Sequence, residues 1–187
     1  MRIFVYEFVT GGGMLEEGLP DSLLREGDAM LRAIASDLCV IEGTEVVTTR
    51  DSRAPNWRDS PRGLHIVEVN SPIDESEAFD RLAAEADAAI VIAPEIGGAL
   101  TARLLRLERI GARLLGVGYE LAALASDKFA CGNFLAARGV AVPRGVLAAG
   151  AGERGPVFGF PAVIKPRDGA GCLGVRRIKC IAEWREM

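Results

Sequence analysis

A glycine-rich run near the end of the sequence is the first candidate for chemistry. Gly169, Ala170, Gly171, Cys172, Leu173 and Gly174 match the spacing G-x-G-x-x-G. In dinucleotide-binding proteins such a run leads from a strand into a helix. Here residues 175–179 alternate like a strand, so the run is predicted to connect two strands. A loop of this kind can lay backbone N–H groups over phosphates, because glycine permits close approach and unusual dihedral angles.

Two lysines are placed to meet phosphate charge. Lys165 ends the apolar run 160–166, directly before the glycine loop, and we expect it on a buried strand. Asp127-Lys128 opens a predicted helix. Each has a simpler interpretation, since an Asp-Lys pair at a helix start is usually solvated and a strand-end lysine is often exposed. Their order along the chain makes them a set: Asp-Lys, a helix, residues 139–143, the lysine-bearing strand and the glycine loop.

With these elements in this order, the chain resembles the ATP-grasp superfamily. In that superfamily the two lysines contact the nucleotide phosphates and the glycine loop closes over them, so the resemblance implies ATP at Lys128, Lys165 and residues 169–174. Upstream, residues 94–98 and 110–116 resemble the approach to the ATP-grasp domain in carboxylate–amine ligases. The opening residues 6–13, with 24–31, resemble a narrower group that includes the tyramine–glutamate ligase of methanofuran-type cofactor biosynthesis.

The resemblance implies a reaction and its cofactors. It implies an ATP-dependent ligase of amino-acid or cofactor biosynthesis that forms a C–N bond through an acyl phosphate, with ATP and Mg²⁺. No catalytic residue is assigned within the chain. Family members carry the magnesium ligands, a ribose-binding acid and an arginine for the acyl phosphate in a second subdomain. We therefore expect no metal ligand within residues 1–187, no turnover from these residues alone, and either a fragment or a degenerate relative.

The predicted elements place these residues on an α/β fold. Strands predicted at residues 2–9, 45–49, 65–69, 88–93 and 113–117 alternate with helices at 20–38, 74–86 and 98–110. This alternation predicts a parallel, Rossmann-like sheet covered on both faces. We expect residues 1–118 to form a pre-ATP-grasp substrate domain. Residues 119–187 are expected to form the first α+β subdomain of an ATP-grasp fold, left incomplete.

The second half has its own predicted elements. A helix is expected over residues 126–138, with Ser126 as N-cap and Gly139 at its end. A strand at 140–147, a mobile glycine-rich linker at 148–156, and strands at 162–166 and 174–178 follow. The last two strands would flank the glycine loop.

Two segments are candidates for substrate binding, because ligands gather at the carboxyl ends of parallel strands. The loop Thr10, Gly11, Gly12 and Gly13 follows the first predicted strand and offers N–H groups that suit a carboxylate. Glu95 follows the fourth strand and suits an ammonium or a hydroxyl. The alternative is structural: the glycines make a tight turn and Glu95 caps the next helix.

Composition limits the partners. The net charge of -4 gives no reason to expect nucleic acid or an anionic membrane surface. No apolar run approaches the roughly 18 residues of a membrane span. The start of the chain enters a strand rather than a signal peptide, and the four cysteines lack C-x-x-C spacing, so we expect a cytoplasmic protein with free thiols. The expected partners are a small-molecule carboxylate and an amine. The face where a second subdomain would pack is expected to favour a homo-oligomer.

Two other functions are open at this stage. One is an NAD-binding Rossmann protein that uses residues 10–13 for the pyrophosphate and Asp51 for the ribose, although three consecutive glycines lack the G-x-G-x-x-G spacing. The other is a non-catalytic module that binds or senses a nucleotide without turnover.

Overall fold

The computed structural model describes residues 1–169 and 172–186, which divide into two compact units. The first unit comprises Met1–Pro94 and Ala99–Tyr119. The second comprises Glu95–Gly98 and the chain from Glu120 onward. Within the described residues, no helix is long and apolar enough to cross a membrane.

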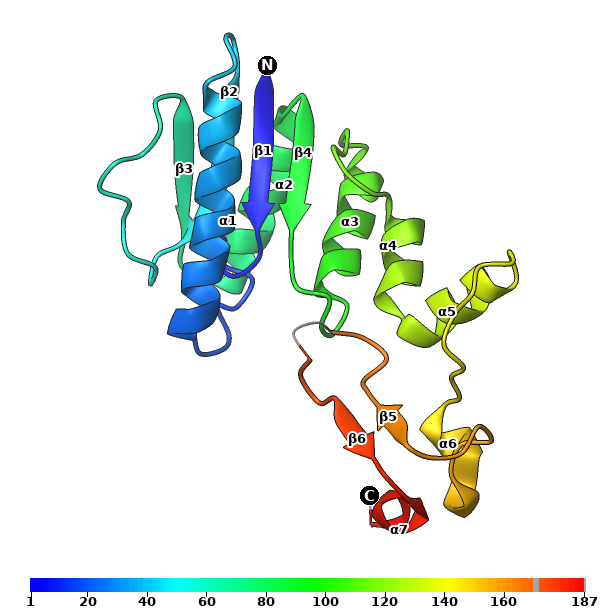
Figure 1. The fold of residues 1–187 in the computed structure, drawn as a ribbon. Coiled ribbons are helices and arrows are strands. Elements are labelled where there is room, and N and C mark those ends of the chain that lie inside the picture. The colour runs from blue at the N-terminus through cyan, green and yellow to red at the C-terminus, as the bar shows by residue number, and fades with distance from the viewer. Residues whose placement is uncertain (170–171, 187) are drawn as a thin grey trace. The chain divides into compact units, whose positions relative to one another are not determined.

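A four-stranded parallel sheet forms the centre of the first unit (Figure 1). Its strands are β1 (Arg2–Glu7), β2 (Glu45–Asp51), β3 (Leu64–Val69) and β4 (Ala88–Ile92), in the order β3-β2-β1-β4. The predicted parallel α/β sheet is therefore confirmed. The chain adds strands on one side of β1 and then returns to its other side. The carboxyl ends of β1 and β4 thus lie at the point where the strand order reverses, which is where open α/β sheets bind ligands.

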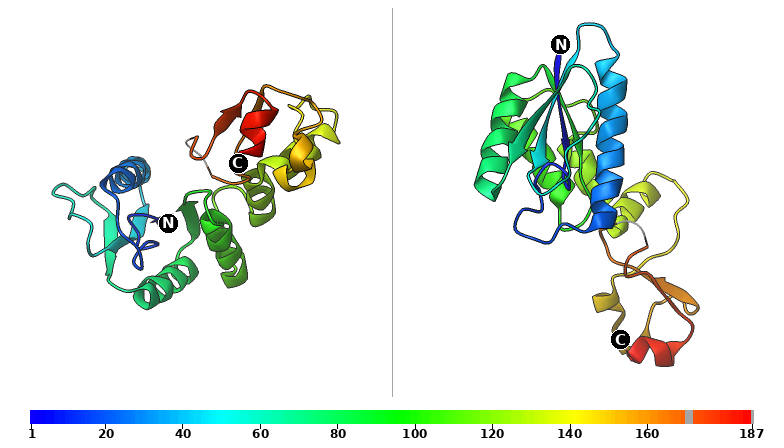
Figure 2. Two further views of the ribbon diagram at one scale, coloured as in Figure 1. Left: turned by 90° about the horizontal axis from the view of Figure 1, so that it is seen from below. Right: turned by 90° about the vertical axis from the view of Figure 1, so that its left-hand side faces the viewer.

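Helices cover both faces of this sheet, as Figure 2 shows in its right-hand view. Leu31 and Ala35 of α1 (Asp21–Cys39) pack against Ile3 and Val5 on one face. The other face packs against α2 (Pro72–Glu85) and α3 (Ala99–Ile110). The buried residues between them include Phe4, Tyr6, Val47, Phe79, Leu82 and Leu107. Alternate residues of β1 thus serve opposite faces, as the two-residue period of a strand requires.

The prediction of a fifth strand at residues 113–117 is wrong. This segment makes only an isolated parallel bridge between Leu114 and Ala89. Two hydrogen bonds hold the bridge, from Ala89 N–H to Arg113 O and from Leu115 N–H to Ala89 O, both at 2.8 Å. Gly111 and Gly116 bracket the segment with positive φ, so the chain turns away before a ladder can form.

The second unit begins with two short helices, α4 (Tyr119–Ser126) and α5 (Lys128–Ala136). The helix predicted over residues 126–138 is present as α5, but its predicted N-cap, Ser126, is wrong, because Asp127 has extended backbone and caps α5 itself. The predicted end is confirmed. Gly139 has a φ of +79°, and the bonds from Gly139 N–H to Ala136 O and from Val140 N–H to Leu135 O form a Schellman motif.

The remaining chain of this unit forms a small antiparallel hairpin with short helical turns before and after it. Its strands are β5 (Ala162–Ile164) and β6 (Arg176–Ile178), with Val163 opposite Arg177. The glycine loop therefore joins two strands, as predicted. The turns are α6 (Ala148–Ala151), a 3-10 turn η1 (Gly152–Arg154) and α7 (Ile181–Arg185).

The strand predicted for the segment before the hairpin is wrong. Residues 140–147 form no strand, since Pro143 removes a backbone donor and no neighbouring strand pairs with the segment. Residues 148–156, predicted as a mobile linker, contain the short turns α6 and η1. Trp184 of α7 donates its indole N–H to Gly152 O at 2.8 Å and so anchors these turns.

Candidate nucleotide-binding and substrate-binding residues

Asp127 organises the start of α5. Its Oδ1 accepts hydrogen bonds from the N–H groups of Phe129 and Ala130, both at 3.0 Å. Its Oδ2 accepts a hydrogen bond from the guanidinium of Arg167. The Arg167 guanidinium and the Ala130 N–H lower the pKa of Asp127 to about 2, so this carboxyl is charged at every ordinary pH.

Lys128 contacts the chain where the glycine loop begins. Its Nζ donates to Asp168 O at 2.7 Å and to Gly169 O at 2.6 Å. Its backbone N–H donates to Arg167 O at 2.9 Å. Among the described residues these two carbonyls are the acceptors of Lys128 Nζ. An ammonium has three donors, so one N–H is left for an acceptor outside them.

The glycine loop is described in part. Ala170 and Gly171 lie outside the described residues. Gly169, Cys172 and Gly174 have φ values of +80°, +60° and +70°, which are left-handed conformations that favour glycine. At Gly174 a Cβ would lie 2.9 Å from Cγ of Pro166. Leu173 between them is exposed. The described part of the loop thus has the left-handed backbone conformations expected of a phosphate-binding glycine loop.

Lys165 was expected on a buried strand, and this is wrong. β5 ends at Ile164, and Lys165 follows it as an exposed residue. Its ammonium has no hydrogen bond or ion pair to the described residues. The two strands of the hairpin have three residues each and are too short to bury a side chain at the end of β5. An unpaired lysine beside the loop is free to meet a phosphate.

Glu95 lies in the segment that joins β4 to α3, yet Glu95–Gly98 clusters with the second unit. Glu95 O accepts from Gly169 N–H at 2.6 Å, and Gly97 N–H donates to Asp168 Oδ2 at 3.1 Å. The Glu95 side chain is exposed. The backbone of this segment therefore supports the root of the glycine loop, a role that the sequence did not indicate.

The loop Thr10, Gly11, Gly12 and Gly13 turns tightly at the carboxyl end of β1. The N–H groups of Gly11 and Gly13 donate to Glu7 O and Phe8 O, at 2.7 and 2.8 Å. A Cβ would lie 2.5 Å from Glu7 O at Gly11, 2.7 Å from Val69 at Gly12, and 2.5 Å from the Phe8 ring at Gly13. The glycines are required by packing, and most of the loop's donors are used within it.

Glu7 is a buried carboxylate that sequence reasoning missed. Its oxygens accept from Val9 N–H at 3.2 Å, Thr10 N–H at 2.7 Å and Thr10 Oγ1 at 2.8 Å. Gly27 of α1 makes room for it, since a Cβ there would lie 2.4 Å from Glu7 Oε2. Burial raises the pKa of Glu7, and the hydrogen bonds from Thr10 oppose that rise. A lone acid in the run RIFVYEFV was the available signal.

A second carboxylate fixes the far side of the same loop. Asp51 N–H donates to Thr10 O at 2.7 Å. The buried Asp51 carboxylate pairs with Arg53 at 2.7 Å, and Arg53 also donates to Met14 O and Glu17 O, both at 2.8 Å. Burial opposes ionisation, but the hydrogen bonds from Arg53 lower the pKa of Asp51. This carboxylate is already paired and buried, which argues against its use for a ribose and hence against the NAD-binding alternative.

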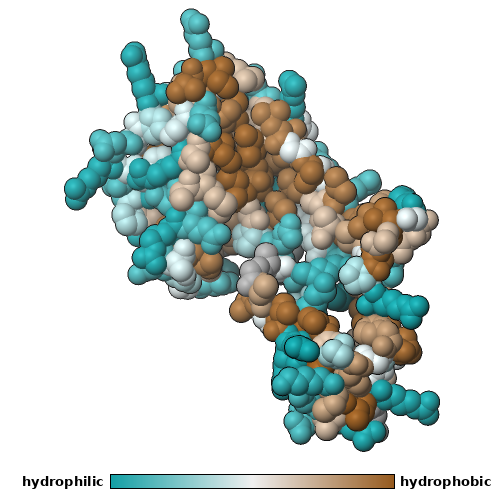
Figure 3. Space-filling model, in the orientation of Figure 1, coloured by the Kyte–Doolittle hydropathy of each residue, from teal (hydrophilic) through white to brown (hydrophobic). Residues whose placement is uncertain are grey.

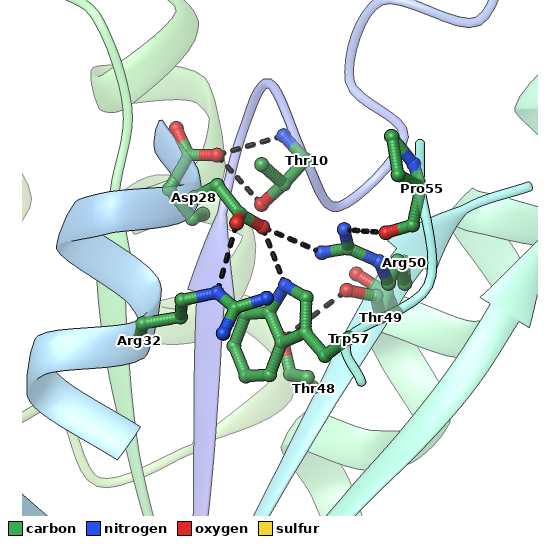
Figure 4. A network of polar contacts seen from close by, with 9 residues as sticks. Thr10, Asp28, Arg32, Thr48, Thr49, Arg50, Pro55 and Trp57 are labelled. Atoms are coloured by element: carbon green, nitrogen blue, oxygen red, sulfur yellow. Dashed lines mark hydrogen bonds and ion pairs between the residues drawn. The ribbon is translucent and has the colours of Figure 1, made fainter. Parts of the chain in front are cut away.

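Beside this loop, Asp28 of α1 holds a polar network that Figure 4 shows. Asp28 accepts from Arg32 at 2.9 Å, Arg50 at 2.9 Å and the Trp57 indole at 2.6 Å. The Arg32 guanidinium also stacks 4.3 Å from the Trp57 ring centroid. The network attaches the irregular chain after β2 to α1, so its role is structural.

Metal-ligating side chains are not gathered in the described part of the chain. Among residues 1–169 and 172–186, no three His, Cys, Asp or Glu side chains are grouped to hold a metal ion.

Comparison with known proteins places this geometry in context. Residues 44–120 match the family of pre ATP-grasp 3 domains. Among solved structures, the chain is similar to a protein from Archaeoglobus fulgidus described as an ATP-grasp superfamily protein, with 24% identity and a TM-score of 0.65, over 90% of this chain and 47% of that one. It is also similar to the D-alanine–D-alanine ligase from Bacillus anthracis, with 19% identity and a TM-score of 0.61, over 100% of this chain and 52% of that one.

The chain spans about half the length of these two structures. A comparison with curated protein sequences finds no significant match. The sheet, its covering helices and the hairpin together have the fold of the corresponding part of these ATP-grasp proteins, and residues 44–120 resemble a pre-ATP-grasp domain.

Proposed function

We propose that the protein binds ATP through Lys128, Lys165 and the glycine-rich loop of residues 169–174, as part of an ATP-dependent ligase. The observation that carries this proposal is the geometry at the loop root. Lys128 holds the carbonyls of Asp168 and Gly169 and keeps one donor, and Lys165 stands unpaired after β5. Two ammonium groups beside left-handed glycines suit the phosphates of a nucleotide.

The proposed reaction joins a carboxylate to an amine. A carboxylate oxygen attacks the γ-phosphorus of ATP, the bond to the bridging oxygen breaks, and ADP leaves with the electron pair. The amine nitrogen then attacks the acyl carbon, inorganic phosphate leaves, and the nitrogen loses a proton. In such transfers the protein mainly positions the reactants and neutralises charge. Lys128 and Lys165 would supply that charge.

The substrates belong to the same proposal. Thr10, Gly11, Gly12 and Gly13 would lie against the carboxylate and Glu95 against the amine, and the resemblance to tyramine–glutamate ligases makes L-glutamate and tyramine the first pair to test. Strand order supports a ligand at the carboxyl ends of β1 and β4. The use of loop donors by Glu7 and Phe8 limits what the glycines can offer.

The nucleotide assignment is tested by ATP titration in a calorimeter, on the full-length protein. Lys165→Ala should weaken ATP binding about tenfold, because a charge-assisted hydrogen bond contributes about 1.5–3 kcal/mol. Lys128→Ala should weaken it at least as much. Lys179→Ala is the matched control, since Lys179 follows β6 at the opposite end of the hairpin. Unchanged affinity in both Lys128→Ala and Lys165→Ala would reject the site.

The ligase assignment needs a second measurement. ADP release from ATP and Mg²⁺ should require both a carboxylate and an amine. ATP binding without any substrate-dependent ADP release, across a panel of amino acids and amines, would instead support the non-catalytic nucleotide-binding module.

The amine site is tested by Glu95→Gln. If Glu95 binds the amine, this change should raise the KM for the amine about tenfold, since an ion pair becomes a neutral contact. ATP affinity and Tm should stay unchanged, because the Glu95 side chain is exposed and its backbone contacts remain. Glu120→Gln, at another exposed acid, is the control. A lower Tm with an unaltered KM would make Glu95 a structural residue.

A further inference from the structure

Asp127 and Lys128 hold the root of the glycine loop, residues 167–169, by four separate contacts. Asp127 pairs with the Arg167 side chain. Lys128 N–H donates to Arg167 O, and Lys128 Nζ donates to the carbonyls of Asp168 and Gly169. Three consecutive residues, Arg167 to Gly169, are thus bound by the N-cap and the first residue of α5.

The ammonium of Lys128 is fixed by this arrangement. A lysine side chain has four rotatable bonds, and its charge is ordinarily free to move over several positions. Here two of its three donors are directed at carbonyls that belong to the segment tied to Asp127 through Arg167. Displacing that segment would move both carbonyls and with them the third N–H.

We propose that Asp127 and Arg167 are positioning residues for the nucleotide, which act by fixing the loop root so that the one remaining N–H of Lys128 points at a phosphate oxygen. This inference rests on the proposed function. It assigns Lys128 a single bond to phosphate, with its other two N–H groups kept on the loop. It also assigns Arg167 a role through its pairing with Asp127, and not through a bond to phosphate of its own.

A helix cap alone does not account for the arrangement. Capping uses only Oδ1 of Asp127, which bonds to Phe129 and Ala130. Oδ2 points away from those donors and binds a side chain 40 residues along the chain. The two oxygens therefore have separate partners, and the two roles can be separated by substitution.

The test is a double-mutant cycle that measures ATP affinity by calorimetry in the full-length protein. Arg167→Gln should weaken ATP binding about fivefold to tenfold in the wild-type background. In the Lys128→Ala background it should change the Kd by less than twofold, because the residue through which it acts is gone. Arg167→Lys keeps a cation for Asp127 and should restore the wild-type Kd within about twofold.

Asp127→Asn separates the ion pair from the cap, since asparagine caps a helix as well as aspartate does. It should weaken ATP binding as much as Arg167→Gln does, with the Tm unchanged. Because the pKa of Asp127 is about 2, the ratio between variant and wild type should be constant from pH 5 to 9. Arg177→Gln is the control for removal of an arginine from the same hairpin.

The outcomes are distinct. If Arg167→Gln has no effect, or weakens ATP binding equally with and without Lys128, Arg167 does not act through Lys128 and the inference is wrong, while ATP binding itself stands. If the wild-type protein does not bind ATP, both the inference and the proposed function fail.

Discussion

At the scale of single residues, the choice between lysine and arginine is informative. The chain has 22 Lys and Arg residues, and only Lys128, Lys165 and Lys179 are lysines. Arginine presents a planar fork that suits fixed pairs, such as Arg50 with Asp28 and Arg53 with Asp51. Lysine is a compact charge with three rotatable donors. Lys128 contacts the first residues of the glycine loop and Lys165 precedes that loop in sequence, which fits a role in meeting a variable number of phosphate oxygens.

Glu7 supports a prediction about pH. Its pKa is raised in the folded protein because burial disfavours the charged form. The folded state therefore holds this proton more tightly than the unfolded state. The stability contributed by Glu7 is fully present below its unfolded pKa and is lost as the pH rises through the folded value. The advantage of the wild type over Glu7→Gln should shrink from pH 4 to pH 7.

Urea unfolding midpoints of the two proteins across this pH range provide the measurement. Glu16→Gln, at an exposed acid of the following loop, is the control and should show no such trend. A constant or growing gap between wild type and Glu7→Gln would mean that the carboxylate is not desolvated as the structure shows.

At the scale of elements, the main features were predictable from local patterns. Runs of β-branched and aromatic residues predicted four strands, and apolar residues at helical spacing predicted α1. The boundary errors have local causes as well. Ser71 accepts a hydrogen bond from Asp74 N–H at 3.1 Å, and this cap starts α2 at Pro72 rather than at Asp74. A Ser-Pro start is recognisable in hindsight.

The loop between β1 and α1 supports a prediction about dynamics. Arg53 ties Met14 and Glu17 to Asp51, so its guanidinium spans from β2 to the middle of this loop. Arg53→Gln should increase amide hydrogen exchange of residues 11–17 about tenfold, while exchange in β1 stays the same. The readout is mass-spectrometric exchange on the folded protein.

Arg58→Gln is the matched control, because Arg58 is an exposed arginine on the same segment. Equal exchange in both variants would show that Arg53 does not hold the loop. A uniform increase over the whole first unit would show general destabilisation instead.

At the scale of the whole molecule, charge is divided between the two units. The first unit contains 12 arginines and 19 acidic residues, and the second contains 10 Lys and Arg residues and 7 acidic ones. The first unit therefore has a net charge of -7 and the second of +3. Although the whole chain has a net charge of -4, the second unit is basic, and this suits an anionic ligand.

This division predicts how ATP binding depends on salt. Raising NaCl from about 50 to about 500 mM should weaken ATP binding several-fold, because mobile ions screen the attraction between the basic unit and the phosphates. Adenosine, which lacks phosphates, serves as the comparison ligand and should show no such dependence. An ATP affinity that is independent of salt would argue against phosphate recognition by Lys128 and Lys165.

The first unit also carries an apolar area on its surface. Figure 3 shows apolar side chains gathered along the sheet beside α1, over β1 and β4. Ile90 of β4 packs against the cluster under α1 but is only partly buried. A single helix on this face leaves part of it uncovered, which follows from the strand order and not from any single segment.

The sequence by itself determined the parallel sheet, its two covering layers, and the strand–loop–strand setting of the glycine run. These depend on the periodicity of side chains and on glycine and proline, which are properties of neighbours in the chain. Only the tertiary structure decided that Glu7 is buried against Gly27, that Asp51 is saturated by Arg53, and that Lys128 holds the loop root. A buried carboxylate or a fixed ammonium depends on partners from distant elements, and such partners leave no periodic trace in the sequence.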